Sequence, residues 1–376
     1  MPNETGTLYY ICIHYNLTIA VLQLAINKFM KLIELFETMA IVVNEGGWDS
    51  TITQGTKITP TVVSNAINVM KKFTIDFNNW LTKNKQHTIR MGSPLGSTAW
   101  HKLDTSEKEY GDIDLQMIAT NPTQGDISIS QLSTYMNKLV AEFVTQTKPG
   151  YIHDNGKVSG GHIIIRLGSN GYVQIDLIWT EDRLANWQQY RMTPARNIKG
   201  AAYGTLFATL GEIMNLSIQA AGVQMKIKDG LPVDFVKSRK VDKVDTLTTD
   251  IQNFAIDILK VLHSRIQPNS DIKIDPELIA HPGINPDNIT VENLTAAIRG
   301  LAKSFEDNNM YGQYNLKDIT SYNDFIRKFK EHYLNKMTHA AESSKFNKAE
   351  SPEAVAKAAE TKSKLISHAK VIINLL

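Results

Sequence analysis

The sequence contains few of the residues on which several common kinds of site depend. Its 376 residues include one cysteine, Cys12, so the chain can form no internal disulfide framework and offers no thiolate zinc site. An excess of one charge is also lacking, because 40 basic and 38 acidic residues leave a formal net charge of +2. These counts exclude a uniformly polybasic nucleic-acid-binding protein but leave local basic patches open. The cysteine usage favours a reducing compartment.

Long hydrophobic runs are missing too. The apolar run Leu17–Ile26 has ten residues, which is too short to span a bilayer. The first ten residues, "MPNETGTLYY", carry no basic residue, so we expect no secretory signal. From Leu22 on, apolar residues recur at helical spacing: Leu22, Ile26, Phe29, Ile33 and Phe36. This pattern predicts an amphipathic helix docked on the rest of the chain, with membrane attachment as the alternative. Residues before Met30 are either native or an upstream extension.

Turn and capping signals divide the chain into three parts. We expect an N-terminal helix or extension over residues 1–46, a mixed α and β domain over 47–240 and a helical domain over 241–376. In the middle part, Thr59-Pro60 predicts a helix from residue 60 to about residue 81. A Ser-Asn-Gly turn inside Gly160–Trp179 predicts a β-hairpin, and Asp229-Gly230 predicts a second one. In the last part, helix starts are predicted at Asp275-Pro276, Thr290, Ser321 and Ser351-Pro352.

Two aspartates separated by one isoleucine interrupt an apolar strand in "GDIDLQMIA", residues 111–119. Residues i and i+2 of a strand point to the same side, so Asp112, Asp114 and Gln116 share one face. The two aspartate Cα atoms would lie about 6.5–7 Å apart, which lets both carboxylates reach one divalent ion or one ion each of a pair. The alternative is a polar strand face at a sheet edge.

A third acid lies in the middle of the apolar strand of the first predicted hairpin. Alternation in "GYVQIDLIW" places Asp176 there, and burying an unpaired carboxylate costs several kcal/mol. A cation shared with Asp112 and Asp114 would account for its position. A hydrogen-bonded core acid is the alternative reading.

These motifs together resemble the DNA polymerase β-type nucleotidyltransferase superfamily. The shared pattern is a Gly-Ser pair, a loop, an Asp-x-Asp strand and an aspartate on a later strand, and it covers about Ile58–Gly204. Fourteen residues lie between Gly96-Ser97 and Asp112, and eighteen lie between Gly92-Ser93 and Asp112. Both gaps exceed the family's usual spacing, and the first fits better. The segments "GST", "GDIDL", "YVQIDLIW" and "KGA" also resemble nucleotidyltransferase-like proteins of large tailed phages.

The resemblance implies an α+β fold, in which a nucleotidyltransferase palm (a short mixed sheet with helices on one side) joins a mostly helical C-terminal domain. It implies Mg²⁺-dependent transfer of a nucleotide from an NTP, such as ATP, to a hydroxyl of an RNA 3′ end, a protein or a small molecule. Two Mg²⁺ ions, with Mn²⁺ as a substitute, would be held by the three catalytic acids Asp112, Asp114 and Asp176. Gly96 and Ser97, or Gly92 and Ser93, would contact the phosphates.

Several further expectations complete this reading. Arg166 and Lys199 are expected to meet the triphosphate, and four dispersed histidines are not expected to be ligands: His87, His101, His153 and His162. Two basic clusters would either track a nucleic-acid backbone or form solvated faces: Lys237, Arg239, Lys240 and Lys243, and Arg327, Lys328, Lys330 and Lys336. We expect a cytoplasmic protein (in the host cytoplasm if viral) with no membrane partner. The rival function is a non-catalytic nucleotidyltransferase-fold module, serving in interactions or as a virion-associated scaffold.

Overall fold

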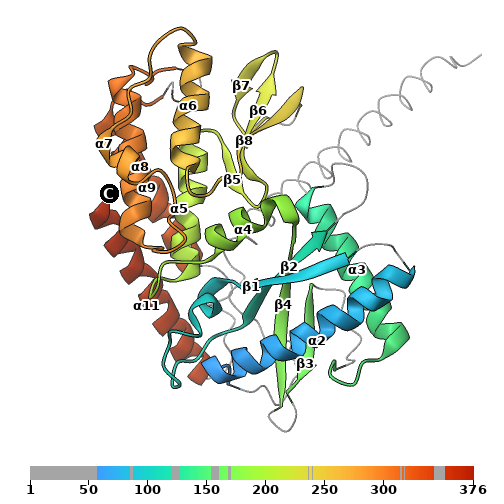
Figure 1. Cartoon of the computed structure of the whole chain (residues 1–376). Coiled ribbons are helices and arrows are strands. Elements are labelled where there is room, and N and C mark those ends of the chain that lie inside the picture. Colours follow the sequence, from blue (N-terminus) through green and yellow to red (C-terminus); the bar gives the residue numbers. More distant parts are fainter. Residues whose placement is uncertain are drawn as a thin grey trace, which may run out of the picture. The chain divides into compact units, whose positions relative to one another are not determined.

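Two β-sheets, each with its own helices, form the described part of the chain in the computed structural model (Figure 1). The structure describes residues 57–84, 88–120, 128–153, 161–167, 171–235, 237–238, 240–313, 316, 318–342 and 352–376. All of them belong to one compact unit, Glu45–Leu376. The amphipathic helix expected near the N-terminus lies outside the described residues.

The first sheet has four strands and mixed pairing. Its order is β1-β2-β4-β3, with β1 at Thr88–Pro94, β2 at Ile113–Thr120, β3 at His162–Arg166 and β4 at Tyr172–Glu181. The pairs β1–β2 and β3–β4 are antiparallel, so the hairpin predicted over residues 160–179 is confirmed. The central pair β2–β4 is parallel. Parallel neighbours need a crossover connection, and α3 (Ile129–Thr147) lies in the chain between them.

Helices α2 (Pro60–Asn84) and α3 cover one face of this sheet. Helix α2 begins at Pro60, as predicted, and Thr59 accepts a hydrogen bond from the Val62 N–H. Stacked and tilted aromatic rings join the two helices, with the Phe77 and Phe143 centroids 5.2 Å apart. Every second residue of the central strands packs into this core: Ile113, Leu115 and Met117 of β2, and Val173, Ile175, Leu177 and Trp179 of β4. The residues between them point to the opposite face.

The second core joins helices to the second sheet. The elements α4 (Ala185–Met192), α5 (Gly200–Ile213), β5 (Ser217–Gln219), β6 (Gly222–Lys228), β7 (Leu231–Val233) and β8 (Lys243–Thr248) come first. Strands β6 and β7 are antiparallel and turn on Asp229-Gly230, so the second predicted hairpin is confirmed. The buried residues of these elements and of the C-terminal helices form one hydrophobic cluster, whose members range in the sequence from Trp187 to Leu376. The boundary between the two hydrophobic cores therefore lies between Trp179 and Trp187. The sequence predicted a domain boundary at residue 240, where strands give way to helices, but that position lies within the second core.

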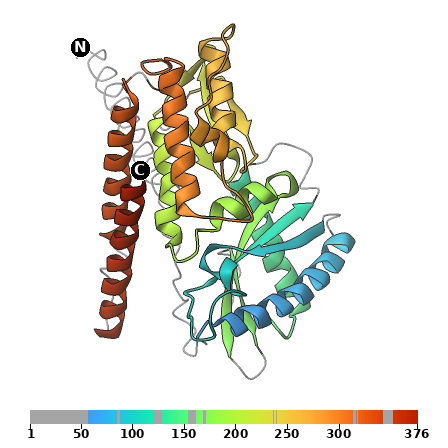
Figure 2. The same cartoon turned by 60° about the vertical axis from the view of Figure 1, so that its left-hand side comes forward.

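The C-terminal helices begin where the capping signals place them. These helices are α7 (Pro276–Ala280), α8 (Val291–Asp307) and α9 (Tyr322–Ala341). Each is preceded by a capping residue whose side chain accepts a hydrogen bond from a backbone N–H in the first turn: Asp275, Thr290 and Ser321 respectively. Helix α6 (Phe254–Ile266) precedes them, and α11 (Pro352–Leu375) runs beside α9 in both views (Figures 1 and 2). None of the helices in the described part of the chain has the length and apolar content needed to cross a membrane.

Helix α4 connects the two cores, and it departs from the expectation of helices on one side of the sheet. Its residues lie on the face of the first sheet opposite α2 and α3, where the buried Gln116 side chain of β2 donates to the Ala185 carbonyl. On its other side, Arg191 donates to the Ile218 carbonyl of β5, and burial lowers the pKa of this guanidinium to about 10. The helix therefore covers one end of the face on which the aspartates lie.

Two helical glycines provide a test of this packing. A Cβ at Gly300 of α8 would lie 2.5 Å from the Leu278 backbone nitrogen of α7, whereas a Cβ at Gly204 of α5 would meet nothing within 4 Å. We expect Gly300→Ala to lower the free energy of unfolding by about 1–3 kcal/mol through overpacking. Gly204→Ala should raise it by up to about 1 kcal/mol, because alanine favours a helix. Urea unfolding of the two variants measures both, and equal effects would contradict the α7–α8 packing.

Candidate metal centre

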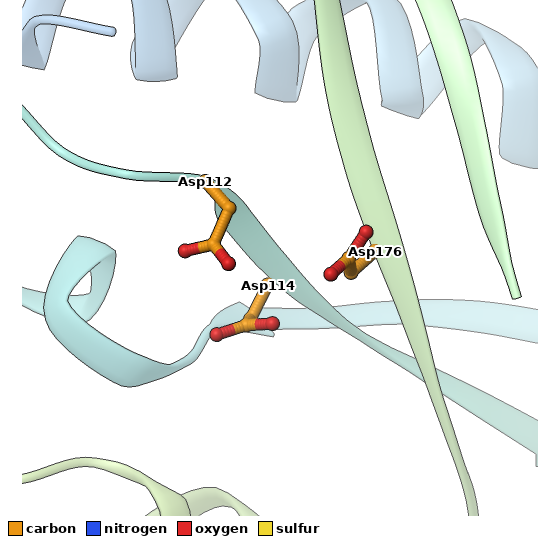
Figure 3. A group of neighbouring side chains, drawn as sticks. All are labelled: Asp112, Asp114 and Asp176. Atoms are coloured by element: carbon orange, nitrogen blue, oxygen red, sulfur yellow. The ribbon is translucent and has the colours of Figure 1, made fainter. Parts of the chain in front are cut away.

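Three aspartates from the two central strands converge on the face opposite α2 and α3 (Figure 3). Asp114 of β2 and Asp176 of β4 are direct neighbours in the parallel register, and Asp112 lies immediately before β2. One carboxylate oxygen of each lies within 4.8 Å of the others, and all three residues are half-buried. The structure thus brings Asp176 next to Asp112 and Asp114, which the sequence predicted to lie on a different strand.

The donor set fits a hard divalent cation. Three clustered carboxylates repel one another unless a cation neutralises them, and Mg²⁺ prefers carboxylate oxygens together with substrate phosphates. Among the described residues, the group contains no histidine and no cysteine, so a site for zinc of the usual nitrogen and sulfur type is not formed.

Gln174 orients the third acid, a role that the sequence reading did not assign. Its side-chain amide donates to Asp176 Oδ1 at 2.8 Å, from two residues earlier on the same face of β4. Gln174 is 8% exposed, yet its Oε1 accepts no hydrogen bond from any residue in the described ranges. His162, opposite Asp176 in the β3–β4 register, likewise has a buried Nε2 without a described partner. The alternation of polar and apolar residues that located Asp176 also places Gln174 on the same face, but no sequence motif predicts that a glutamine amide will orient a carboxylate.

The turn after β1 lies directly against the acids. Gly96 has a φ of +56°, and a Cβ there would lie 2.7 Å from Asp114 Oδ2. The N–H of Leu95 donates to the Asp114 carbonyl at 2.9 Å. Ser97 follows at the exposed start of the 3-10 helix η1 (Gly96–Trp100). Glycine is therefore required at this position for both its backbone angle and the space beside the carboxylate.

The other Gly-Ser pair lies farther along the sheet. Gly92 is inside β1, and a Cβ there would lie 2.9 Å from the Cβ of Gln116, the residue two places beyond Asp114. Gln116 is buried beneath α4, where it also donates to Gln188 Oε1. Of the two candidates, the structure places Gly96-Ser97 beside the acids and Gly92-Ser93 away from them, with Ser93 also inside β1.

The two basic residues expected near a triphosphate lie in different parts of the structure. Lys199 is at the start of α5, and its backbone N–H donates to His368 Nδ1. It follows the loop whose Pro194 carbonyl accepts the indole N–H of Trp100 in η1. Arg166 is on β3, at the opposite edge of the sheet, where it pairs with Tyr172 of β4. The structure does not bring Arg166 and Gly96 together.

No model of a known protein family matches the sequence, and a search of curated proteins finds no match either.

Neutralising the acids should separate metal binding from folding. We expect Asp112→Asn with Asp114→Asn to raise the Tm in metal-free buffer, because the carboxylate repulsion is removed. Added Mg²⁺ should stabilise the unaltered protein by about 2.7 kcal/mol at about 100 times its Kd and leave the double variant unchanged. Thermal unfolding with and without MgCl₂ measures this. Asp182→Asn, an exposed aspartate that follows β4, is the control and should keep the Mg²⁺ response. A double variant that unfolds without metal would show that the acids are structural.

Gly96 can be tested independently of the acids. Gly96→Ala should lower the free energy of unfolding by about 1–2 kcal/mol, the cost of a left-handed backbone at alanine. It should also weaken the Mg²⁺ response, because the added methyl displaces the Asp114 carboxylate. Gly111→Ala is the matched control, since a Cβ there meets nothing within 4 Å. Equal Mg²⁺ titrations for the two variants would contradict the close approach of Gly96 to Asp114.

Proposed function

We propose that this protein transfers a nucleotide from an NTP to a hydroxyl group in a Mg²⁺-dependent reaction. The observation that supports this best is the carboxylate group Asp112, Asp114 and Asp176 beside the positive-φ turn at Gly96. Clustered acids alone are common on protein surfaces. A glycine turn held against the same carboxylates adds a backbone surface that a triphosphate can approach closely.

The three acids would hold the metal, with Mg²⁺ expected and Mn²⁺ as a substitute. When bound, the divalent ions supply charge neutralisation at the phosphates and activation of the attacking hydroxyl. The Oε1 of the buried Gln174, two residues from Asp176, has no hydrogen-bond partner among the described residues, which supports a further polar group at this place.

The residues around the acids would divide the remaining tasks. The Gly96 turn and the Ser97 hydroxyl would bind the phosphates, and Lys199 at the start of α5 would add a positive charge. Gln174 holds one oxygen of Asp176 by donating to it, which fixes the orientation of the carboxylate. The second oxygen of Asp176 would then accept a hydrogen bond from the acceptor hydroxyl and hold its proton as the hydroxyl oxygen attacks the α-phosphorus and pyrophosphate leaves.

The rival proposal is the non-catalytic module. Three carboxylates within 4.8 Å of one another repel unless a cation binds, and the glycine turn beside them adds a surface for a phosphate, so the site favours the catalytic proposal over this module. We also propose a cytoplasmic location, which is supported by the single cysteine.

Transfer of label from α-labelled NTPs to a mixture of RNA, protein and small-molecule acceptors tests the activity. We expect Mg²⁺-dependent labelling of one acceptor class, and a loss of about 100-fold or more in Asp176→Asn, because the transition state loses a charged group. Asp182→Asn is the control and should keep the activity. No labelling by the unaltered protein, together with no stabilisation by any Mg²⁺–NTP pair, would favour the scaffold.

A further inference from the structure

An aromatic and basic patch lies on the same face of the first sheet as the three acids. It consists of Arg166 on β3, Tyr172 on β4 and His153, which pairs with β3 through its backbone. The rings of His153 and Tyr172 have centroids 4.7 Å apart. The Arg166 guanidinium lies 5.6 Å from the centre of the Tyr172 ring and donates to its hydroxyl at 3.0 Å. We call these three residues the Tyr172 patch.

No carboxylate of the described residues neutralises the charge of the Tyr172 patch. Arg166 is exposed and pairs with no carboxylate among the described residues. The basic clusters noted in the sequence differ, because most of their described members have acidic partners: Lys237, Lys243, Arg327, Lys328 and Lys336. A half-buried tyrosine and an exposed histidine beside an exposed guanidinium suit the planar bases and the phosphates of an unpaired nucleic-acid strand.

The patch is connected to the acids along one strand. Tyr172, Gln174 and Asp176 are alternate residues of β4 and point to the same face. At about 3.3 Å per residue, the Tyr172 and Asp176 Cα atoms lie roughly 13 Å apart. The buried polar atoms without described partners, Gln174 Oε1 and His162 Nε2, lie in this interval. A ligand seated on the Tyr172 patch would therefore extend along β4 towards Asp176.

The order of the strands separates this patch from the phosphate side of the site. Gly96 follows β1, the patch lies on β3 and β4, and the acids of β2 and β4 lie between them. In an in-line displacement the attacking and leaving oxygens are on opposite sides of the phosphorus. With the triphosphate on the Gly96 turn, the attacking hydroxyl arrives from the side of Asp176 and the Tyr172 patch.

We propose that the Tyr172 patch binds the acceptor, and that the acceptor is a single-stranded nucleic acid whose terminal hydroxyl reaches Asp176. This inference rests on the proposed function, since it names the acceptor class for that site. A base stacks on Tyr172 and His153, and Arg166 meets a backbone phosphate. Arg166 thus belongs to acceptor binding, whereas the sequence suggested triphosphate binding.

Fluorescence anisotropy of a short labelled single-stranded RNA of mixed sequence, with the full chain, tests the proposal. Tyr172→Ala should weaken binding about tenfold, the effect of losing one stacked base, and Tyr172→Phe, which keeps the ring, should stay within about twofold. Arg166→Ala should weaken binding and reduce the slope of log K against log salt by about 0.7, the value for one phosphate contact on a single strand. Arg166→Lys should keep that slope. The control is Arg183→Ala, an exposed arginine that follows the far end of β4 and pairs with Glu181, and it should bind like the unaltered protein.

Two further measurements make each outcome decisive. The Tm of every variant with Mg²⁺ and ATP shows whether it is folded and whether the metal–nucleotide site is intact. RNA and DNA that fail to bind, or binding that Tyr172→Ala and Arg183→Ala alter equally, would overturn the inference. If NTP-dependent stabilisation and label transfer to a protein or small molecule persist in Tyr172→Ala, the inference fails while the proposed function stands. If RNA binds at the patch but no nucleotide stabilises the protein, the proposed function fails instead.

Discussion

The parallel pairing of β2 with β4 is the constraint on which the candidate site depends. It places Asp114 beside Asp176, while the flanking apolar residues of both strands enter the core under α2 and α3. A slip of one residue would turn the aspartates into that core and the isoleucines towards solvent. The burial of Ile113, Leu115, Ile175 and Leu177 therefore stabilises the register that holds the carboxylates together against their repulsion.

The face that carries the acids changes character along its length. At one end α4 covers it, and Gln116 is fully buried between the Ala185 carbonyl and Gln188. The middle carries the half-buried aspartates. Beyond them, Gln174 of β4 and Ile164 of β3 are buried again. At the far end, the hairpin of β3 and β4 extends past the beginning of β2, and there the described ring and cation contacts of Tyr172 are with Arg166 and His153.

Much of the fold could be predicted from local signals. Capping residues are read one helix at a time, and Thr59, Asp275, Thr290 and Ser321 each precede a helix in the structure. Hairpins depend on a turn and its flanking residues, so both predicted hairpins are present. The boundary between cores could not be predicted in this way. It depends on which faces of α4, α5 and the second sheet pack together, and those contacts join residues far apart in the chain.

Alternation on two strands was enough to identify Asp112, Asp114 and Asp176 as residues that share a face without belonging to the core. Only the tertiary structure decided which of the other candidates accompany them. Gly96 contacts Asp114 whereas Gly92 contacts Gln116, and Arg166 lies on the far strand next to Tyr172. The physical reason is that periodicity specifies the side of a strand to which a residue points, whereas the order of strands in a sheet is set by the packing of segments distant in the sequence.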